Sequence, residues 1–204
     1  MYQEISGLLF HPDGFFARKQ NEEIHLLVPA VIVGIGGIVN FLSPLLTVAV
    51  TRREDVSNFM IMPSAVLYFL LLPFALWLVM AGVLYVVSRL LSGTGSFPAT
   101  LQNTGYGYLP QTLLSPFIAI NGIAQPWIAG IQPSVYLTVL VAILGAGLIL
   151  GLFWSGALWT VAMEKTHSLS RLKAMAGPAL IVLFSLLPLI LVILTESAAR
   201  GPLP

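Results

Sequence analysis

The chain has 204 residues, of which 57% are hydrophobic and 8% are charged, so we expect an integral membrane protein without a soluble catalytic domain. A formal net charge of +1 leaves no clustered cations for neutralising phosphates, which argues against a large nucleic-acid-binding surface. The absence of cysteine excludes disulfides, thiolate nucleophiles and sulfur-ligated metals.

Residues 1–25 precede the first long apolar run and are predicted to form a short cytoplasmic or interfacial segment. Phe15 and Phe16 supply apolar contact with the membrane, the "HPDG" stretch predicts a turn, and Arg18 with Lys19 can meet anionic head groups. A frayed cytosolic tail is the alternative.

Five segments are apolar and long enough to cross a hydrocarbon core about 30 Å thick, which needs roughly 20 helical residues. They cover about residues 26–50, 59–88, 104–124, 135–163 and 174–195. Such continuous runs satisfy their backbone groups within helices, whereas a barrel needs short alternating strands. The predicted fold class is all-α, a polytopic membrane helix bundle in a single domain of residues 1–204.

The orientation of this bundle follows from the cations near the span ends. With five spans, one side carries Arg18, Lys19, Arg89, Lys165, Arg171 and Lys173, and the other carries Arg52, Arg53 and Arg200. The richer side should be cytoplasmic, which predicts an N-in, C-out topology with five transmembrane helices. If the third segment were a re-entrant loop, the cations would be divided almost evenly between the two sides of the membrane. Their distribution would then not predict an orientation.

Polar side chains inside the spans are few, and no ionisable residue lies near the middle of a span, which argues against an ion-coupled transporter. The candidates for lining a pocket between the helices are Asn40, Tyr108, Gln111, Ser115 and Ser155. Prolines inside nearly every span predict kinked helices.

Small residues recur at four-residue spacing in the fourth span, at Gly147, Gly151 and Ser155. In lipid, helices associate through close backbone approach at such positions. The stripe therefore predicts helix packing, either inside the bundle, which we favour, or against a second copy of the chain.

Two Glu-x-x-His units, Glu22 with His25 and Glu164 with His167, have the i, i+3 spacing that places both side chains on one helix face. Two such units with further carboxylates hold di-iron centres in helical bundles. Both units lie at span ends, where Glu and His are ordinarily solvated, so we predict no metal and no other cofactor and keep the four residues as candidates only. The sequence has no Gly-rich phosphate loop, nucleophile elbow or metalloprotease motif, and we predict no enzyme.

The stretch "NTGYGYLPQTLL" resembles the Gly-Tyr-x-x-x-Pro signature that opens the third span of Yip-domain proteins, the Ypt/Rab-interacting membrane proteins and their prokaryotic relatives. Gly105, Tyr106 and Pro110 match that signature. The N-terminal "LLFHPDGFFARKQNEE" is similar to the Pro-x-x-Phe-Phe lead-in of the prokaryotic members, and residues 164–180 resemble the loop between the fourth and fifth spans. The glycines would permit a tight entry from loop to helix, the tyrosines would anchor at head-group level, and Pro110 would lie in the first helical turn.

The resemblance implies five spans, an N-in, C-out topology and a prokaryotic-type member in a bacterial or archaeal cell membrane. Eukaryotic members resemble adaptors for prenylated Rab GTPases and carry a longer cytosolic region before the spans. We therefore expect a non-catalytic interaction or organising module that contacts membrane lipids and a cytoplasmic or membrane protein, or a second copy of itself. Its contact surface would combine the N-terminal segment, residues 89–103 and residues 164–173. The alternatives are a small transporter or lipid-handling protein that uses the kinked bundle, and a metal-binding membrane enzyme.

Overall fold

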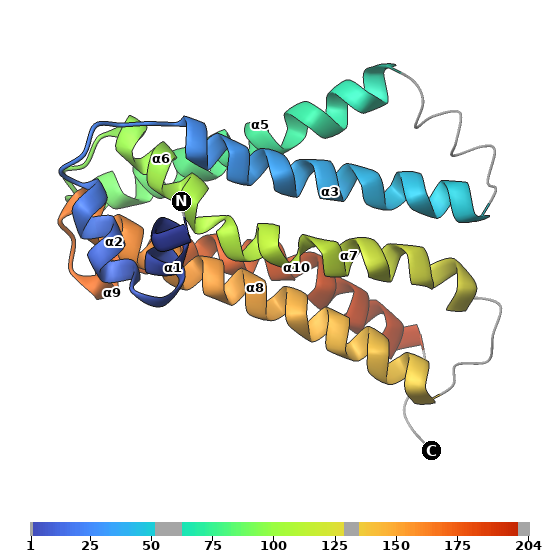
Figure 1. The fold of residues 1–204 in the computed structure, drawn as a ribbon. Helices are drawn as coiled ribbons and strands as arrows, with labels where there is room; N and C mark the ends of the chain where they lie inside the picture. Colours follow the sequence, from blue (N-terminus) through green and yellow to red (C-terminus); the bar gives the residue numbers. More distant parts are fainter. Residues whose placement is uncertain (1, 52–62, 129–134, 200–204) are drawn as a thin grey trace.

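The computed structural model describes residues 2–51, 63–128 and 135–199, and within these ranges the ordered elements are all helices (Figure 1). The helices are α1 (Tyr2–Phe10), α2 (Pro12–Lys19), α3 (Leu27–Thr51), α5 (Pro63–Leu90), α6 (Phe97–Gly107), α7 (Leu109–Ile128), α8 (Val135–His167), α9 (Arg171–Ala174) and α10 (Ala176–Ala199). The predicted all-α class is confirmed. The cations Arg52, Arg53 and Arg200, which define the second predicted side, lie outside the described residues.

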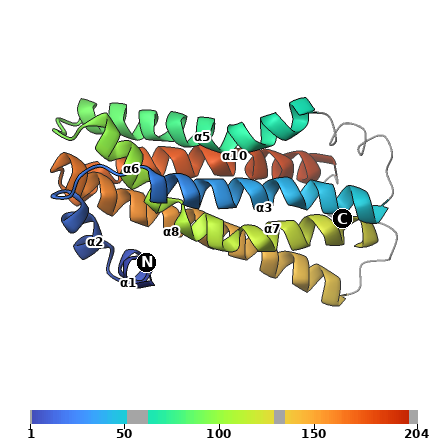
Figure 2. The same cartoon turned by 45° about the horizontal axis from the view of Figure 1, so that its top comes forward.

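The five long helices form a ring in which each helix contacts two neighbours. The neighbours in order are α3, α7, α8, α10 and α5, and α5 closes the ring against α3 (Figures 1 and 2). A further contact joins α5 to α8. The ring therefore brings together helices that are separated by as much as half the chain.

Much of the outer surface of the ring is apolar. Large side chains such as Leu71, Val79, Leu150, Leu183 and Phe184 are exposed on α5, α8 and α10. A soluble monomer rarely exposes contiguous patches of this extent, whereas lipid is a suitable solvent for them. Within the described residues, two segments, Leu70–Leu90 and Gly145–His167, are long and apolar enough to cross a membrane.

The third predicted segment differs from the expectation, because it is divided into two helices at Tyr108. The first, α6, begins at Phe97, where the Ser96 hydroxyl accepts a hydrogen bond from the Ala99 amide at 3.4 Å. It contacts α3, α5 and α8 at the end of the ring where α1, α2 and α9 also lie (Figure 1). The second, α7, takes its place in the ring with Pro110 as its second residue, where the missing amide donor costs little.

The core is concentrated at this end of the molecule. Its buried members include Leu8, Phe15, Phe16, Tyr106, Leu109, Leu158, Trp159 and Met163, which come from α1, α2, α6, α7 and α8. The N-terminal segment is therefore packed on the protein through α2. The expectation that Phe15 and Phe16 contact lipid is wrong, because both rings are 2% exposed or less.

Candidate functional site

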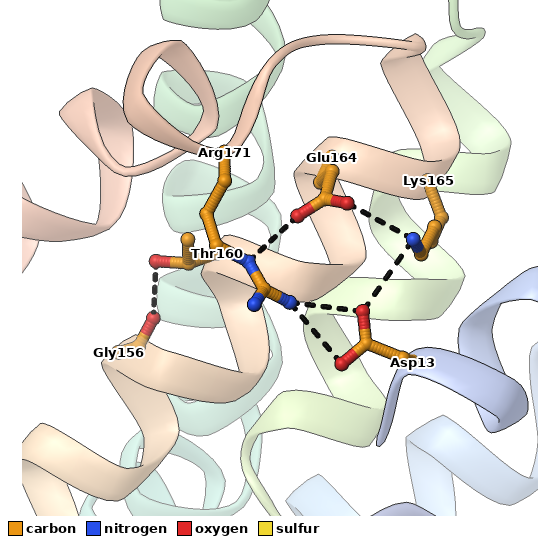
Figure 3. Close-up of polar contacts among 6 residues, drawn as sticks. All are labelled: Asp13, Gly156, Thr160, Glu164, Lys165 and Arg171. Atoms are coloured by element: carbon orange, nitrogen blue, oxygen red, sulfur yellow. Dashed lines mark hydrogen bonds and ion pairs between the residues drawn. The ribbon is translucent and has the colours of Figure 1, made fainter. Parts of the chain in front are cut away.

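An ion-pair network joins α2 to the end of α8 and to α9 (Figure 3). The Arg171 Nη2 atom donates to both carboxylate oxygens of Asp13, at 2.9 and 3.1 Å, and Arg171 Nε donates to Glu164 at 2.8 Å. The Lys165 ammonium lies 2.9 Å from Glu164 and 3.4 Å from Asp13. The network connects three elements that are separate in the sequence, and exposed ion pairs of this kind add little stability. Partial burial acts to raise the pKa of Asp13, but the hydrogen bonds and charges of Arg171 and Lys165 outweigh it and lower that pKa below its ordinary value.

A buried histidine ties the loop between α5 and α6 to the end of α8. His167 Nε2 lies 2.9 Å from the Thr100 hydroxyl oxygen, and the Thr100 hydroxyl donates its own proton to the Ser96 carbonyl at 2.9 Å. With the Thr100 proton given to Ser96, the hydroxyl oxygen can accept from Nε2–H, and we assign this tautomer to the neutral imidazole. Nδ1 is then unprotonated, and it has no hydrogen-bond partner among the described residues. The backbone adds a bond from the Thr94 amide to the His167 carbonyl at 3.1 Å.

The same loop approaches His167 so closely that only glycine fits. A Cβ atom on Gly93 would lie 2.8 Å from the Cβ atom of His167. Two side-chain amides of α6 make further hydrogen bonds to the other segments. Asn103 Nδ2 donates to the Thr166 hydroxyl at 2.8 Å, and Gln102 Oε1 accepts from the His25 backbone amide at 2.6 Å. Residues 2–25, 91–103 and 164–173 thus form one surface, which we call the end face.

The residues of the Gly-Tyr-x-x-x-Pro signature lie in the packed layer beneath the end face. Tyr106 is only 6% exposed, with its ring edge-on to Phe15 at 5.0 Å and the Lys19 ammonium 5.6 Å from its centroid. A Cβ atom on Gly105 would lie 2.6 Å from Pro29, and one on Gly107 would overlap the Trp159 indole. The expectation of a loop entry with head-group tyrosines is therefore wrong. The glycines lie within α6 and allow neighbouring helices to approach it closely. Tyr106 packs in the core.

Two tryptophans that the sequence analysis did not single out hold the end of α6. At the break the Tyr108 amide bonds to the Gly105 carbonyl, which frees the Thr104 carbonyl, and Trp159 Nε1 donates to that carbonyl at 2.9 Å. Trp77 Nε1 donates to the Leu101 carbonyl at 3.0 Å. A buried carbonyl needs a donor, and a buried indole N–H needs an acceptor, so a tryptophan within an apolar helix was the available signal for such a contact.

A cavity of about 360 Å³, the ring cavity, lies among the five ring helices. Its lining residues are Val33, Gly36, Gly37, Leu72, Pro73, Leu76, Met80, Tyr108, Gln111, Thr112, Ser115, Leu152 and Ser185. Three of the predicted pocket residues, Tyr108, Gln111 and Ser115, are among them. Ser155 is buried in α8 without a hydrogen-bond partner and does not line the cavity, and the Asn40 side chain lies outside the described part of the chain.

The small-residue stripe of α8 is divided between two environments. A Cβ atom on Gly151 would lie 2.6 Å from Leu114, so this glycine packs against α7 inside the ring. Ser155 is fully buried one turn later. Gly147 has open space where a Cβ atom would lie. The stripe therefore contributes to internal packing at Gly151 and Ser155, and a Cβ atom on Gly147 would meet no atom of the described residues within 4 Å.

The four candidate metal ligands face different partners. Glu22 accepts from Lys19 at 2.7 Å, and the His25 side chain is exposed. Glu164 is held by Arg171 and Lys165, and His167 by Thr100. Among the residues that the structure describes, which include all four candidates, no three His, Cys, Asp or Glu side chains gather to hold a metal ion.

Comparison with known proteins gives one family and one relative. A family model described as Yip1 domain matches residues 6–193. An uncharacterized protein of the archaeon Methanocaldococcus jannaschii is 31% identical over 107 residues, which cover 50% of this chain and 76% of that protein. No solved structure matches.

Proposed function

The chain belongs to the Yip1 domain family, and from this premise we propose that it is a non-catalytic module that organises contacts at the membrane through its end face. Membership of this family is consistent with a membrane-associated role, and the apolar outer surface of the ring agrees with that setting. The archaeal relative supports a bacterial or archaeal cell membrane as its location.

The proposed topology has five transmembrane helices, α3, α5, α7, α8 and α10, with the N-terminus inside and the C-terminus outside. A re-entrant third segment would place Arg171 on the opposite side of the membrane from residues 1–25. The ion pair between Asp13 and Arg171 supports the five-span arrangement, because two groups in direct contact must lie on the same side.

One observation carries the proposed interaction role. Three segments that are remote in sequence are joined into a single surface by the Asp13–Arg171 ion pair and the His167–Thr100 hydrogen bond, at the end where charge predicts the cytoplasm. Large apolar side chains, including Leu90 and Leu172, remain exposed at that end. An ordered surface that combines charged and exposed apolar groups suits a protein partner.

Labelling of single cysteines tests the topology, and the cysteine-free chain gives no background. In intact cells, Gln20→Cys and Ser170→Cys should resist a membrane-impermeant maleimide, and Ser134→Cys should react. Reaction of Gln20→Cys and Ser170→Cys from opposite sides would exclude the proposed arrangement.

Crosslinking tests the interaction role. A photoreactive amino acid at Leu172, on the end face, should capture one stoichiometric protein in native membranes. The same group at Leu183, on the apolar outer surface, should capture lipid and is the matched control. Recovery of lipid alone from both positions would contradict a protein-organising role.

A further inference from the structure

We propose that the ring cavity binds one uncharged membrane lipid, a hydrocarbon chain that carries a hydrogen-bonding oxygen, and that Gln111 recognises this oxygen. This inference goes beyond the proposed role of the end face and shares with it only the placement of the ring in the membrane. It assigns a ligand class to a site that the end face does not include.

The size of the ring cavity points to a ligand. At about 360 Å³ it falls within the range of small-molecule pockets, roughly 300 to 1,000 Å³. The cavity is partly open to the surroundings of the ring, so a ligand could enter it, and an unfilled wall loses its dispersion contacts. All five ring helices contribute to the lining, so an occupant would be held by the whole bundle.

The chemistry of the walls excludes a charged occupant. Most lining side chains are apolar, among them Val33, Leu72, Leu76 and Leu152, and the described lining contains no charged side chain. A phosphate or ammonium group inside this cavity would have no counter-charge, and an unpaired charge in an apolar environment is strongly disfavoured. A hydrocarbon chain fits these walls, and the membrane around the ring supplies such chains.

The polar groups of the lining are mostly committed to the protein itself. The Thr112 hydroxyl donates to the Ile32 carbonyl at 3.0 Å, and the Ser115 hydroxyl donates to the Thr112 carbonyl at 2.7 Å. The Tyr108 hydroxyl donates to the sulfur of Met80. These groups shape the cavity without offering a free hydrogen-bond donor.

The side-chain amide of Gln111 and the hydroxyl of Ser185 make no hydrogen bond in the part of the chain that the structure describes, and of the two only the amide presents two donors. A primary amide has two donors and one acceptor oxygen, and polar groups at membrane depth are expensive to leave unpaired. An alcohol, ester or carbonyl oxygen accepts from such an amide without bringing a charge. Gln111 therefore selects an oxygen-bearing hydrocarbon over a plain one.

A proline shapes the α5 wall of the ring cavity. Pro73 lies inside α5 and lines the cavity, and proline within a helix removes one backbone hydrogen bond and bends it. Figure 1 shows α5 diverging from α3 toward the end remote from α1 and α2.

A matched pair of photoreactive probes tests the proposal on the purified full chain in detergent. One probe is a sixteen-carbon alcohol that carries a diazirine and an alkyne, and the other is the same chain without the hydroxyl. The alcohol probe should label cavity-lining peptides of α5 and α7 at one site per chain, and unlabelled hexadecanol should displace it. Labelling restricted to the outer surface of the ring, or labelling that hexadecanol does not displace, would overturn the proposal.

Two variants separate recognition of the oxygen from occupation of the cavity. Gln111→Leu should reduce labelling by the alcohol probe about tenfold, the loss expected for one hydrogen bond, and should leave labelling by the hydrocarbon probe unchanged. Leu152→Trp, which fills the cavity, should abolish both. Leu113→Ala, at an exposed position on α7, is the control and should change neither. Equal labelling of Gln111→Leu and the native chain by the alcohol would refute the assigned role of Gln111.

The two proposals fail independently. Displacement of the probe by hexadecanol is measured on the native chain and does not depend on any variant folding. Gln111→Leu should also leave crosslinking from Leu172 unchanged, so an empty cavity would not count against the end face.

Discussion

Replacing Phe15 with alanine should release α2 from the end face. The ring is 2% exposed and lies edge-on to Phe16 at 5.2 Å and to Tyr106 at 5.0 Å. Removing a buried phenylalanine costs about 3 to 5 kcal/mol, and we take the lower value because a released segment can re-enter the membrane interface. About 3 kcal/mol corresponds to a change of roughly a hundredfold in the docking equilibrium.

Hydrogen exchange followed by mass spectrometry measures this release. Protection of the α2 amides should fall by about a hundredfold in Phe15→Ala, and protection of α8 should stay close to that of the native chain. Phe10→Ala removes an aromatic ring from the same segment, but that ring is 70% exposed, so its effect should stay within about threefold. Native protection of α2 in Phe15→Ala, or an equal loss in every helix, would refute the reasoning that this ring docks α2 locally.

Three further predictions concern the layer beneath the end face and its ion pairs. Gly107→Ala places a Cβ atom against a packed indole and should lower stability by about 1 to 3 kcal/mol in thermal unfolding, whereas Gly145→Ala, with open space around it, should be neutral or stabilising. Thr100→Val leaves the buried Nε2–H group of His167 without its acceptor and should cost about 1 to 3 kcal/mol in the same assay. The pKa of Asp13 is lowered from its ordinary 3.8 in the folded chain, so its ion pairs stabilise the folded state above that value and are lost as the pH falls through the lower folded pKa. Exchange of the α2 amides, corrected for the intrinsic effect of pH, should rise in that acidic window, and Asp13→Asn should remove the step.

The long helices could be predicted because uninterrupted apolar runs leave the backbone few alternatives. The predicted segment 26–50 corresponds to α3 (Leu27–Thr51), and 135–163 corresponds to α8, which continues to His167. The extra turn of α8 ends at His167, whose contact with Thr100 local hydropathy cannot reveal. Whether these helices cross the membrane five times stays a prediction.

The start of α6 was missed because its residues are polar compared with the spans, and hydropathy alone treats them as a loop. The signal was nevertheless present, since Ser96 followed by Phe97 and Pro98 is typical of a capped helix N-terminus with proline in the first turn. What the sequence could not supply is the set of partners that bury α6. Trp77 reaches α6 from the preceding helix, 24 residues from its partner, and Trp159 reaches it from α8, 55 residues from its partner.

The candidate site shows the same division between local and long-range information. The Glu-x-x-His spacing is a local property, but the partners of Glu164 and His167 come from α9 and α6, and these contacts take the two side chains away from any shared metal. Asp13 and Arg171 are separated by 158 residues, so only the folded chain pairs them. Gln111 could be predicted as a pocket residue because a primary amide is unusual in an apolar helix. The cavity that it lines could not be predicted, because five helices from different parts of the chain form it.

The Gly-Tyr-x-x-x-Pro stretch joins the two functional regions of the molecule. On one side, Tyr106 packs under Phe15 and Lys19 of the end face. On the other side, the Tyr108 hydroxyl bonds to Met80, and both residues line the ring cavity. The helix break between these tyrosines is held by the Trp159 indole, so α6 cannot shift without disturbing a contact of each region.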